Sequence, residues 1–327
     1  MNKKEISINI NLVTWNGERY LPWLCQSLKK QTFKNWELLV LDNSSFDKSL
    51  TIIKEYISQA KIIKQKENIG FARGHNLLIN WSDSDYILVL NQDIILEPDY
   101  LEKIIDFLEV NPLVASAAGK VMVWDFEEGK KSKIIDSWGL VIDKKRKVVD
   151  WQQGKKDYYL ENKEVFGLSG SATIFRRRNL ENIKELKDNS YQYFDEDFFA
   201  YKEDIDLAWR LRLNGWESYL ITNTKAYHHR TVNLKEDRKL RGAVNKLSYR
   251  NHLMLLYKNS FLRNFMKDFF LVIWYELQKI IYFLIHERST LLGLKEFLKA
   301  LPTLRKKRKF IKKLRQVKAE EIYHWFK

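Results

Sequence analysis

The sequence predicts an α/β fold in which helices cover a mainly parallel sheet. Up to residue 90, short apolar segments of strand length alternate with segments whose apolar side chains recur at helical spacing. A helix between two strands carries the chain back across the sheet, so strands joined in this way run parallel. The chain has 327 residues, of which 45% are hydrophobic and 14% aromatic, and this composition is ample for a folded core.

The first strands and helices follow from this alternation. Residues 6–13 alternate apolar and polar side chains and predict a strand, and the polar turn at residues 14–17 leads into a helix with Leu21, Leu24 and Leu28 on its apolar face. The further elements expected up to residue 90 are a strand over 36–41, a helix with apolar residues at 50, 53 and 57, a strand over 60–64, a glycine-bearing loop over 68–76 that enters a helix, and a buried strand over 86–90.

The middle of the chain changes character. Residues 114–175 contain short β-prone segments separated by turns, and they predict a mixed or antiparallel extension of the sheet. Gly167, Gly170 and Ser171 come just before the last of these segments, residues 172–175. Such small residues allow the close approach either of a ligand or of neighbouring backbone, and the pattern leaves both readings open.

The last third of the chain is helical and basic. Residues 230–327 carry 24 Lys and Arg against eight Asp and Glu, whereas residues 1–229 carry 33 against 34. We therefore expect an α/β domain over residues 1–235 and a basic helical region over residues 236–327. Helical periodicity in this region covers four stretches, 253–256, 269–285, 291–304 and 306–326.

One of these stretches, residues 269–285, is apolar enough to suggest a membrane span. It has only 17 residues, however, and Glu276, Gln278 and Lys279 lie in its middle. We expect instead a helix that lies in the membrane interface, with Lys, Arg and aromatic residues against an anionic membrane surface. A soluble helical subdomain packed on the α/β domain is the alternative. The basic region lacks a nucleic-acid-binding motif, so no nucleic acid partner is expected.

The single cysteine and the N-terminal segment indicate the compartment. Cys25 lies on the apolar face of the first predicted helix, so it is expected in the core, and the chain cannot form an internal disulfide. The first residues include lysines, but Asn9, Asn11 and Asn16 interrupt any signal-peptide core. We expect the chain in the reducing cytoplasm, peripheral at the inner face of the cell membrane.

Two carboxylates end predicted strands. Asp42 follows residues 36–41, and Asp93 follows residues 86–90 after Asn91 and Gln92. Open parallel sheets bind ligands beyond the carboxyl ends of their strands, so the two are expected to share one crevice. The dinucleotide-binding glycine pattern and the P-loop pattern are both missing after the first strand.

A cluster of acids and two histidines follow later in the chain. Acids grouped in this way usually persist where a metal, a cation or a proton-transfer role stabilises them. Glu203 and Asp204 lie near a predicted helix N-terminus, where complementing the helix dipole is the alternative role, and Asp206 and Arg210 have the spacing of an intrahelical pair. The six carboxylates of residues 194–216 are Asp195, Glu196, Asp197, Glu203, Asp204 and Asp206.

The two adjacent histidines, His228 and His229, end a strand-like segment after that helix. A neutral imidazole is a good ligand for a divalent ion, although packing in the core or at the surface is the alternative.

Taken in order, these motifs resemble glycosyltransferase family 2, the inverting enzymes of the GT-A fold, and especially its rhamnosyltransferase-like branch. The resemblance covers about residues 5–230. The motifs that carry it are VTWNG (13–17), LDNSS (41–45), NIGFARGHN (68–76), LNQD (90–93), GSA (170–172), FDEDFFAYKEDIDLAWRLRLNGW (194–216) and AYHH (226–229).

The resemblance implies a role for each motif. Asp204 would be the general base that deprotonates the acceptor hydroxyl, and Glu203 would hold or orient it. Asp93 and His228 would bind a divalent metal, Mn²⁺ or Mg²⁺, that holds the donor diphosphate, although His229 remains a possible ligand instead. The residues implied on the donor side are Thr14, Asn16, Asp42, Asn68, Gly70, Arg73, Asn91 and Asp93, and those implied on the acceptor side are Gly170, Ser171 and Asp195.

The implied reaction is inverting transfer of a sugar from a nucleotide-diphosphate donor to a hydroxyl of a lipid-linked or polysaccharide acceptor. It would belong to the synthesis of a cell-surface polysaccharide, with dTDP-L-rhamnose as a candidate donor. Asn91 stands where the wider family has an acid, and Gln92 has no evident role. The rival enzyme class is a sugar nucleotidyltransferase, which would need a glycine-rich basic loop that residues 14–17 lack, and the rival outside enzymes is a catalytically degenerate membrane-binding or nucleic-acid-binding protein.

Overall fold

The computed structural model describes residues 5–187, 189–230 and 238–327. Its strands are β1 (Ile8–Thr14), β2 (Trp36–Asp42), β3 (Lys61–Lys64), β4 (Tyr86–Leu90), β5 (Ile94–Leu96), β6 (Val114–Asp125), β7 (Lys130–Ser137), β8 (Leu140–Ile142), β9 (Val148–Asp150), β10 (Lys163–Glu164), β11 (Ala172–Arg176), β12 (Glu185–Lys187), β13 (Ser190–Gln192) and β14 (Glu217–His228). Its helices are α1 (Leu21–Lys29), α2 (Ser49–Tyr56), α3 (Gly70–Trp81), α4 (Tyr100–Val110), α5 (Arg177–Glu181), η1 (Glu196–Phe198), α6 (Glu203–Leu213), α7 (Arg238–Asn259), α8 (Leu262–Lys267), α9 (Phe269–His286), η2 (Arg288–Leu291), α10 (Leu292–Leu314) and α11 (Ala319–Tyr323).

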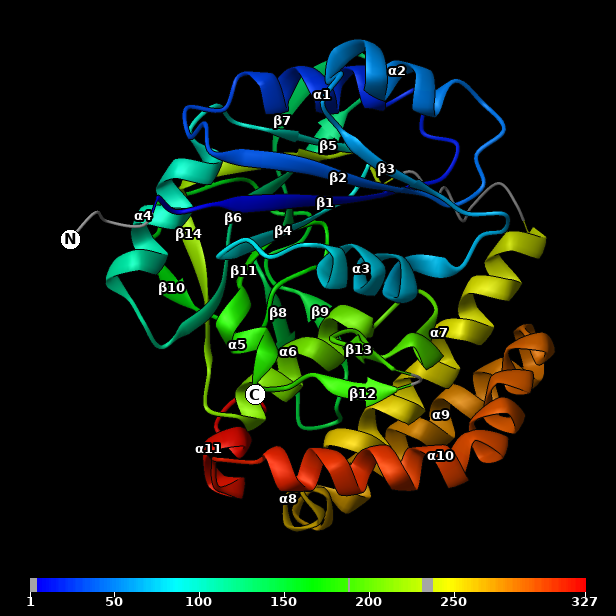
Figure 1. The fold of residues 1–327 in the computed structure, drawn as a ribbon. Coiled ribbons are helices and arrows are strands. Elements are labelled where there is room, and N and C mark those ends of the chain that lie inside the picture. The colour runs from blue at the N-terminus through cyan, green and yellow to red at the C-terminus, as the bar shows by residue number, and fades with distance from the viewer. Residues whose placement is uncertain (1–4, 188, 231–237) are drawn as a thin grey trace.

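The central sheet confirms the predicted mainly parallel arrangement and its mixed extension (Figure 1). Strands run in the order β10-β14-β6-β11-β4-β1-β2-β3, and β1 pairs in parallel with both β2 and β4. Strand β11 lies between β4 and β6 and is antiparallel to both. Because β11 is reversed, the residues that precede it lie at the same edge as the residues that follow β1 and β4. The Gly170–Ser171 segment therefore meets the turns after Thr14 and Leu90.

Helices cover both faces of this sheet. Ile8, Ile10 and Leu12 of β1 pack in one core with α1, α2 and α4, whereas Leu39 and Leu41 of β2 pack against α3 on the other face. Figure 1 shows α1 and α2 on one side of the sheet and α3 on the other. Cys25 is fully buried in the first of these cores, as predicted.

The basic helical region shares a core with the α/β region. Phe198, Trp209 and β8 residues pack in one cluster with Leu255 of α7 and Ile311 of α10. The predicted boundary near residue 235 therefore marks a change of composition, but α7, α10 and α11 pack onto the α/β half of the fold. The helix expected over 269–285 is α9, and it behaves differently, because Val272 is its only buried residue.

The helices at the end of the basic region differ from their predicted limits. The sequence predicts separate helical stretches over 291–304 and 306–326, but α10 continues through Pro302 to Leu314. A proline inside a helix removes one hydrogen bond and clashes with the preceding turn. Contacts on both sides of the proline offset this cost, because Phe297 packs against the shared core before it and Leu304 and Ile311 are buried in that core after it.

Candidate active site

The turn after β1 is tied to the loop after β4. Thr14 Oγ1 donates to Gln92 Oε1 at 2.7 Å, and the Trp15 N–H donates to the same oxygen at 3.0 Å. Gln92, for which the sequence indicated no role, therefore links two segments at the carboxyl edge of the sheet. The Asn16 N–H donates to Ser45 Oγ at 2.9 Å, which joins the β2 loop to the same edge.

Asp42 ends β2 directly opposite Thr14 and is fully buried. One carboxylate oxygen accepts the Ser45 N–H at 3.1 Å, while Oδ2 has no hydrogen-bond partner among the described residues. A buried carboxylate oxygen without a partner is costly, and a hydroxyl or N–H of a ligand would satisfy it. This is the position at which the resemblance implies a contact with the base or ribose.

The glycine loop contacts the acidic segment. Asn68 Oδ1 accepts the Gly70 N–H at 2.9 Å, and Gly70 has φ of +83°. A Cβ on Gly70 would lie 2.6 Å from the Phe199 ring, so this close approach requires glycine. The Phe71 N–H donates to the Phe199 carbonyl at 2.9 Å. Arg73, by contrast, is exposed on α3.

The proposed metal ligands lie side by side. Asp93 Oδ1 is 3.3 Å from His228 Nε2, and the other ring nitrogen of His228 is 2.8 Å from Asp136 Oδ2. Burial disfavours the charged imidazole, but the Asp93 and Asp136 carboxylates outweigh burial and raise the pKa of His228 to about 9. The His229 N–H donates to the Asp93 carbonyl at 3.1 Å, but the His229 ring lies against Tyr20 and Phe126. The geometry therefore selects His228 of the two histidines.

These residues fit a divalent ion as a partial coordination shell. Carboxylate oxygen and imidazole nitrogen are suitable donors, provided that the ion displaces the proton that the two acids stabilise on His228. A carboxylate on the second ring nitrogen is a common way of orienting a ligating histidine. Within residues 5–187, 189–230 and 238–327 there is no group of three or more His, Cys, Asp or Glu side chains arranged to hold a metal. The remaining ligands would have to come from the donor diphosphate or from water.

A cavity of about 480 Å³ brings predicted residues together; we call it the Asp204 cavity. Asp204 stands at the start of α6, where its two carboxylate oxygens accept the N–H groups of Gly170, at 3.1 Å, and Ile205, at 2.8 Å. The other predicted residues that line the cavity are Asn91, Gly170, Ser171, Glu203 and His228.

Of the two adjacent acids, Glu203 is buried and Asp204 is partly buried. Burial raises the pKa of Asp204 despite the two backbone donors. Burial, together with the neighbouring Asp204, raises the pKa of Glu203 to about 8. Glu203 Oε2 has no hydrogen-bond partner among the described residues. When two carboxyls lie this close, one can stay neutral while the other is ionised. The ionised carboxylate can then act as a base, and its neutral neighbour can orient it.

Asp195 lies elsewhere, and its predicted place on the acceptor side requires correction. Its carboxylate forms ion pairs with Lys258 and Lys307, and it does not line the Asp204 cavity. Asp206 pairs with Arg210 at 2.9 Å, as predicted, and also with Lys258 at 3.0 Å. These acids anchor α7 and α10 to the fold, because the lysines that pair with them come from those helices.

Several charged residues in or beside the cavity were not predicted from the sequence. Arg230 bridges Asp136, at 2.5 Å, and Asp150, at 2.7 Å. Lys202, in the left-handed conformation before α6, also lines the cavity. Arg230 directly follows the AYHH motif, so its position beside the histidines was a usable signal. Asp136 and Asp150 lie in β-prone segments that contain no recognised motif, so the sequence did not indicate them.

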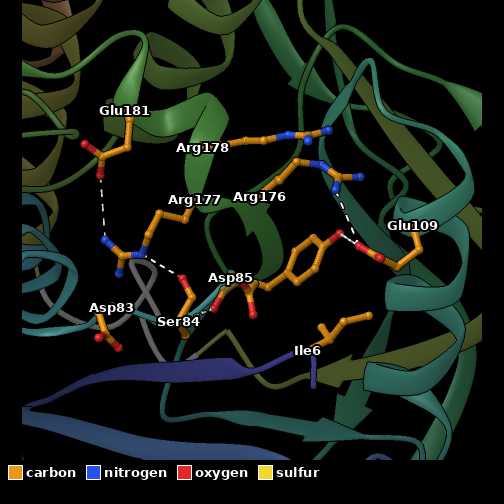
Figure 2. Close-up of a pocket in the computed structure, with 10 residues that line it drawn as sticks. Ile6, Asp83, Ser84, Asp85, Glu109, Arg176, Arg177, Arg178 and Glu181 are labelled. Atoms are coloured by element: carbon orange, nitrogen blue, oxygen red, sulfur yellow. Dashed lines mark hydrogen bonds and ion pairs between the residues drawn. The ribbon is translucent and has the colours of Figure 1, made fainter. Parts of the chain in front are cut away.

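Another cavity, of about 520 Å³, lies at the opposite edge of the sheet, before β4 (Figure 2). Its arginines hold structural groups: Arg177 Nε donates to the Ser84 carbonyl at 2.7 Å and pairs with Glu181 at 3.7 Å. Arg176 pairs with Glu109 at 3.5 Å. Arg176 and Arg177 therefore bind backbone and acids at the ends of strands and helices. Their cavity does not include the acids that line the Asp204 cavity.

Comparisons with known proteins show the family of this chain. A sequence model described as "Glycosyl transferase family 2" matches residues 10–184, more than half of the chain. An uncharacterised glycosyltransferase of Methanocaldococcus jannaschii is 34% identical over 244 residues, which are 69% of this chain and 78% of that protein. An N-acetylglucosaminyl-diphospho-decaprenol L-rhamnosyltransferase of Mycobacterium tuberculosis is 24% identical over 69% of this chain and 76% of its own length. The chain spans about half the length of several other curated relatives that it matches.

A crystal structure of GalNAc-T7 with UDP, GalNAc and Mn²⁺ has the same fold, with a TM-score of 0.60, 11% identity, and coverage of 79% of this chain and 48% of that one. Fold and site thus define a protein of the GT-A glycosyltransferase class. The chain belongs to glycosyltransferase family 2, and its relatives include a rhamnosyltransferase, in agreement with the branch that the motifs resemble.

Proposed function

We propose that this protein is an inverting glycosyltransferase that moves a sugar from a nucleotide-diphosphate donor to a hydroxyl of a lipid-linked or polysaccharide acceptor. The observation that carries the proposal is the Asp204 cavity, in which the Asp204 carboxylate and His228 line one space. His228 in turn lies against Asp93, at the edge of the sheet where Asp42 also ends its strand.

The chemistry follows from these positions. Asp204 takes the proton of the acceptor hydroxyl as its oxygen attacks the anomeric carbon from the face opposite the donor diphosphate. The bond from that carbon to the diphosphate oxygen breaks, and the nucleoside diphosphate leaves with the electron pair. Asp93 and His228 would hold a divalent Mn²⁺ or Mg²⁺, which neutralises charge on the departing diphosphate.

For the donor and acceptor, the mycobacterial relative supports dTDP-L-rhamnose as a candidate donor and a diphospholipid-linked saccharide as the acceptor class. The proposed setting is the synthesis of a cell-surface polysaccharide. GalNAc-T7, whose structure holds UDP, GalNAc and Mn²⁺, has the same fold and supports a nucleotide-sugar donor and a divalent ion.

The surface of α9 supports work at the inner face of a membrane. Phe270, Trp274 and Ile285 are 85%, 63% and 69% exposed, whereas Glu276 and Lys279 face α7, where Glu276 accepts from His252 at 2.8 Å. The helix thus turns its apolar side outward and its polar side inward, the reverse of a helix on a soluble protein. By length and composition, α9 is also the one helix among the described residues that could cross a membrane.

A thermal-shift screen of the full chain tests this function. We expect stabilisation by a nucleoside diphosphate or nucleotide sugar that requires Mn²⁺, and the rhamnose assignment expects the largest shift with dTDP ligands. A preference for UDP or GDP would exclude dTDP-L-rhamnose. No shift with any nucleotide, with or without the metal, would contradict the transferase itself.

A further inference from the structure

A second cavity, of about 340 Å³, adjoins the Asp204 cavity; we call it the Lys279 cavity. It lies between α7, α9 and the turn that joins β8 to β9. Val148, Lys202 and Ser248 line both cavities. A ligand that enters the Asp204 cavity can therefore extend into the Lys279 cavity without leaving the protein surface.

The Lys279 cavity gathers cations from three separate segments. Lys147 comes from the β8–β9 turn, Lys202 from the residue before α6, and Lys279 from α9. Lys147 is exposed, and no ion pair to it occurs among the described residues, whereas Lys279 pairs with Glu276 at 3.0 Å. Such a cluster suits a phosphate better than a neutral sugar.

One acid, Glu287, also lines this cavity, and its charge is already engaged. Asn245 Nδ2 donates to its carboxylate at 2.7 Å, and Arg241 Nε lies 3.7 Å from the same group. Glu287 therefore does not offset the charge of Lys147 or Lys202, and Glu276 is the acid that pairs with Lys279.

The far wall of the cavity is aromatic and continues into the apolar surface of α9. Tyr275, Tyr282 and Phe283 line the cavity, and Tyr282 is itself 51% exposed. From Asp204 outward, the surface thus presents a carboxylate base, then lysines, then aromatic side chains, then the exposed apolar side of α9.

We propose that the Lys279 cavity binds the phosphate or diphosphate group that joins the acceptor sugar to its lipid. The proposal rests on the proposed function. The order of chemistry along the surface matches the order within such an acceptor, in which a sugar hydroxyl, a negative linker and an apolar chain follow one another. The lysines hold the linker, which sets the distance at which the sugar reaches Asp204.

The test measures binding of farnesyl diphosphate to the full chain by calorimetry. Two control ligands are measured in the same way: farnesol, which lacks the diphosphate, and inorganic diphosphate, which lacks the apolar chain. Lys147→Gln and the double variant Lys147→Gln/Lys279→Gln remove charge from the cavity. Lys295→Gln, at an exposed lysine of α10, removes the same charge outside it. We expect the cavity variants to weaken binding by about tenfold or more and the control to bind as the native chain does.

Equal affinity in the cavity variants and the control overturns the proposal, as does binding of farnesol as tight as that of farnesyl diphosphate. Phosphatidylglycerol vesicles are added as a competitor. If they displace farnesyl diphosphate from the native chain but bind more weakly to Lys147→Gln, the cavity binds bilayer lipid instead, which also overturns the proposal.

Thermal melting of the same samples with nucleoside diphosphate and Mn²⁺ separates this inference from the proposed function. A nucleotide shift without prenyl diphosphate binding refutes this inference alone, whereas a missing nucleotide shift refutes the proposed function.

Discussion

Asp204 can accept a proton only while it is ionised, and its surroundings affect the ionised carboxylate in two opposite ways. Burial disfavours the charge, whereas the N–H groups of Gly170 and Ile205 each stabilise one carboxylate oxygen. Gly170 belongs to the segment before the reversed strand β11. The geometry of the proposed base therefore depends on a segment that lies 34 residues away in sequence.

Asp204→Asn is expected to lower the turnover number by about 10²- to 10⁴-fold, because an amide of the same size cannot take the proton. Nucleotide binding should survive, because Asp42 and the Asp93–His228 pair are untouched. Single-turnover assays and thermal shifts with nucleoside diphosphate measure the two effects separately. Turnover close to that of the native enzyme would exclude Asp204 as the base.

Glu203→Gln tests the division of roles between the two acids. Because the pKa of Glu203 is raised to about 8, its carboxyl is protonated at neutral pH, and glutamine copies that neutral state. We expect the variant to keep most of its turnover at neutral pH. Its rate should still fall on acidification, because Asp204 is then protonated. Any inflection of the pH profile near the pKa of Glu203, about 8, should disappear. Rates measured across the pH range give this profile. Loss of transfer at all pH values with intact nucleotide binding would mean that Glu203 carries the proton.

At the scale of elements, α10 is held by a buried ion cluster. Lys307 pairs with Asp197 at 2.6 Å and also with Asp195, and Lys258 of α7 completes the cluster. Burial opposes ionisation of Asp195, but the two lysines outweigh burial and lower its pKa. The cluster therefore contributes stability above the ordinary pKa of an aspartate, and this contribution is lost as the pH falls toward the lowered value.

Lys307→Met is expected to destabilise the fold by about 3–5 kcal/mol, because it leaves a buried carboxylate with one partner fewer. Lys306→Met, at the neighbouring exposed lysine, is the matched control and should change stability by less than about 0.5 kcal/mol. Urea unfolding of both variants measures the difference. Equal midpoints would mean that the cluster contributes nothing to the attachment of α10.

The same cluster shows where prediction from the sequence stops. The parallel strands could be predicted because their signal is local: residues 86–90 form β4 as expected, and Asp42 and Asp93 follow from strand ends. Asp195 could not be placed, because its lysine partners lie 63 and 112 residues further along the chain. Asp136 escaped notice for the same reason, since its partner His228 is 92 residues away.

At the scale of the whole molecule, the exposed apolar side of α9 departs from the surface of an ordinary soluble protein. Phe270→Ser/Ile285→Ser is expected to weaken binding to anionic vesicles by at least about tenfold, because each large side chain contributes about 1.5–3 kcal/mol when it leaves water. Val110→Ser, at a residue of α4 that is 77% exposed, removes a comparable side chain at another surface and should have no effect. Vesicle cosedimentation at low and high salt measures both. Undiminished binding by the double variant would place the membrane contact elsewhere or refute it.

The last residues of the chain are part of the interior. Phe326 packs against Trp209 and Arg146, and its segment forms a parallel bridge with Ile142 of β8. The core beneath α6 therefore cannot close during synthesis until residue 326 has been made, whereas strands β1, β2 and β4 are complete once Leu90 has been made.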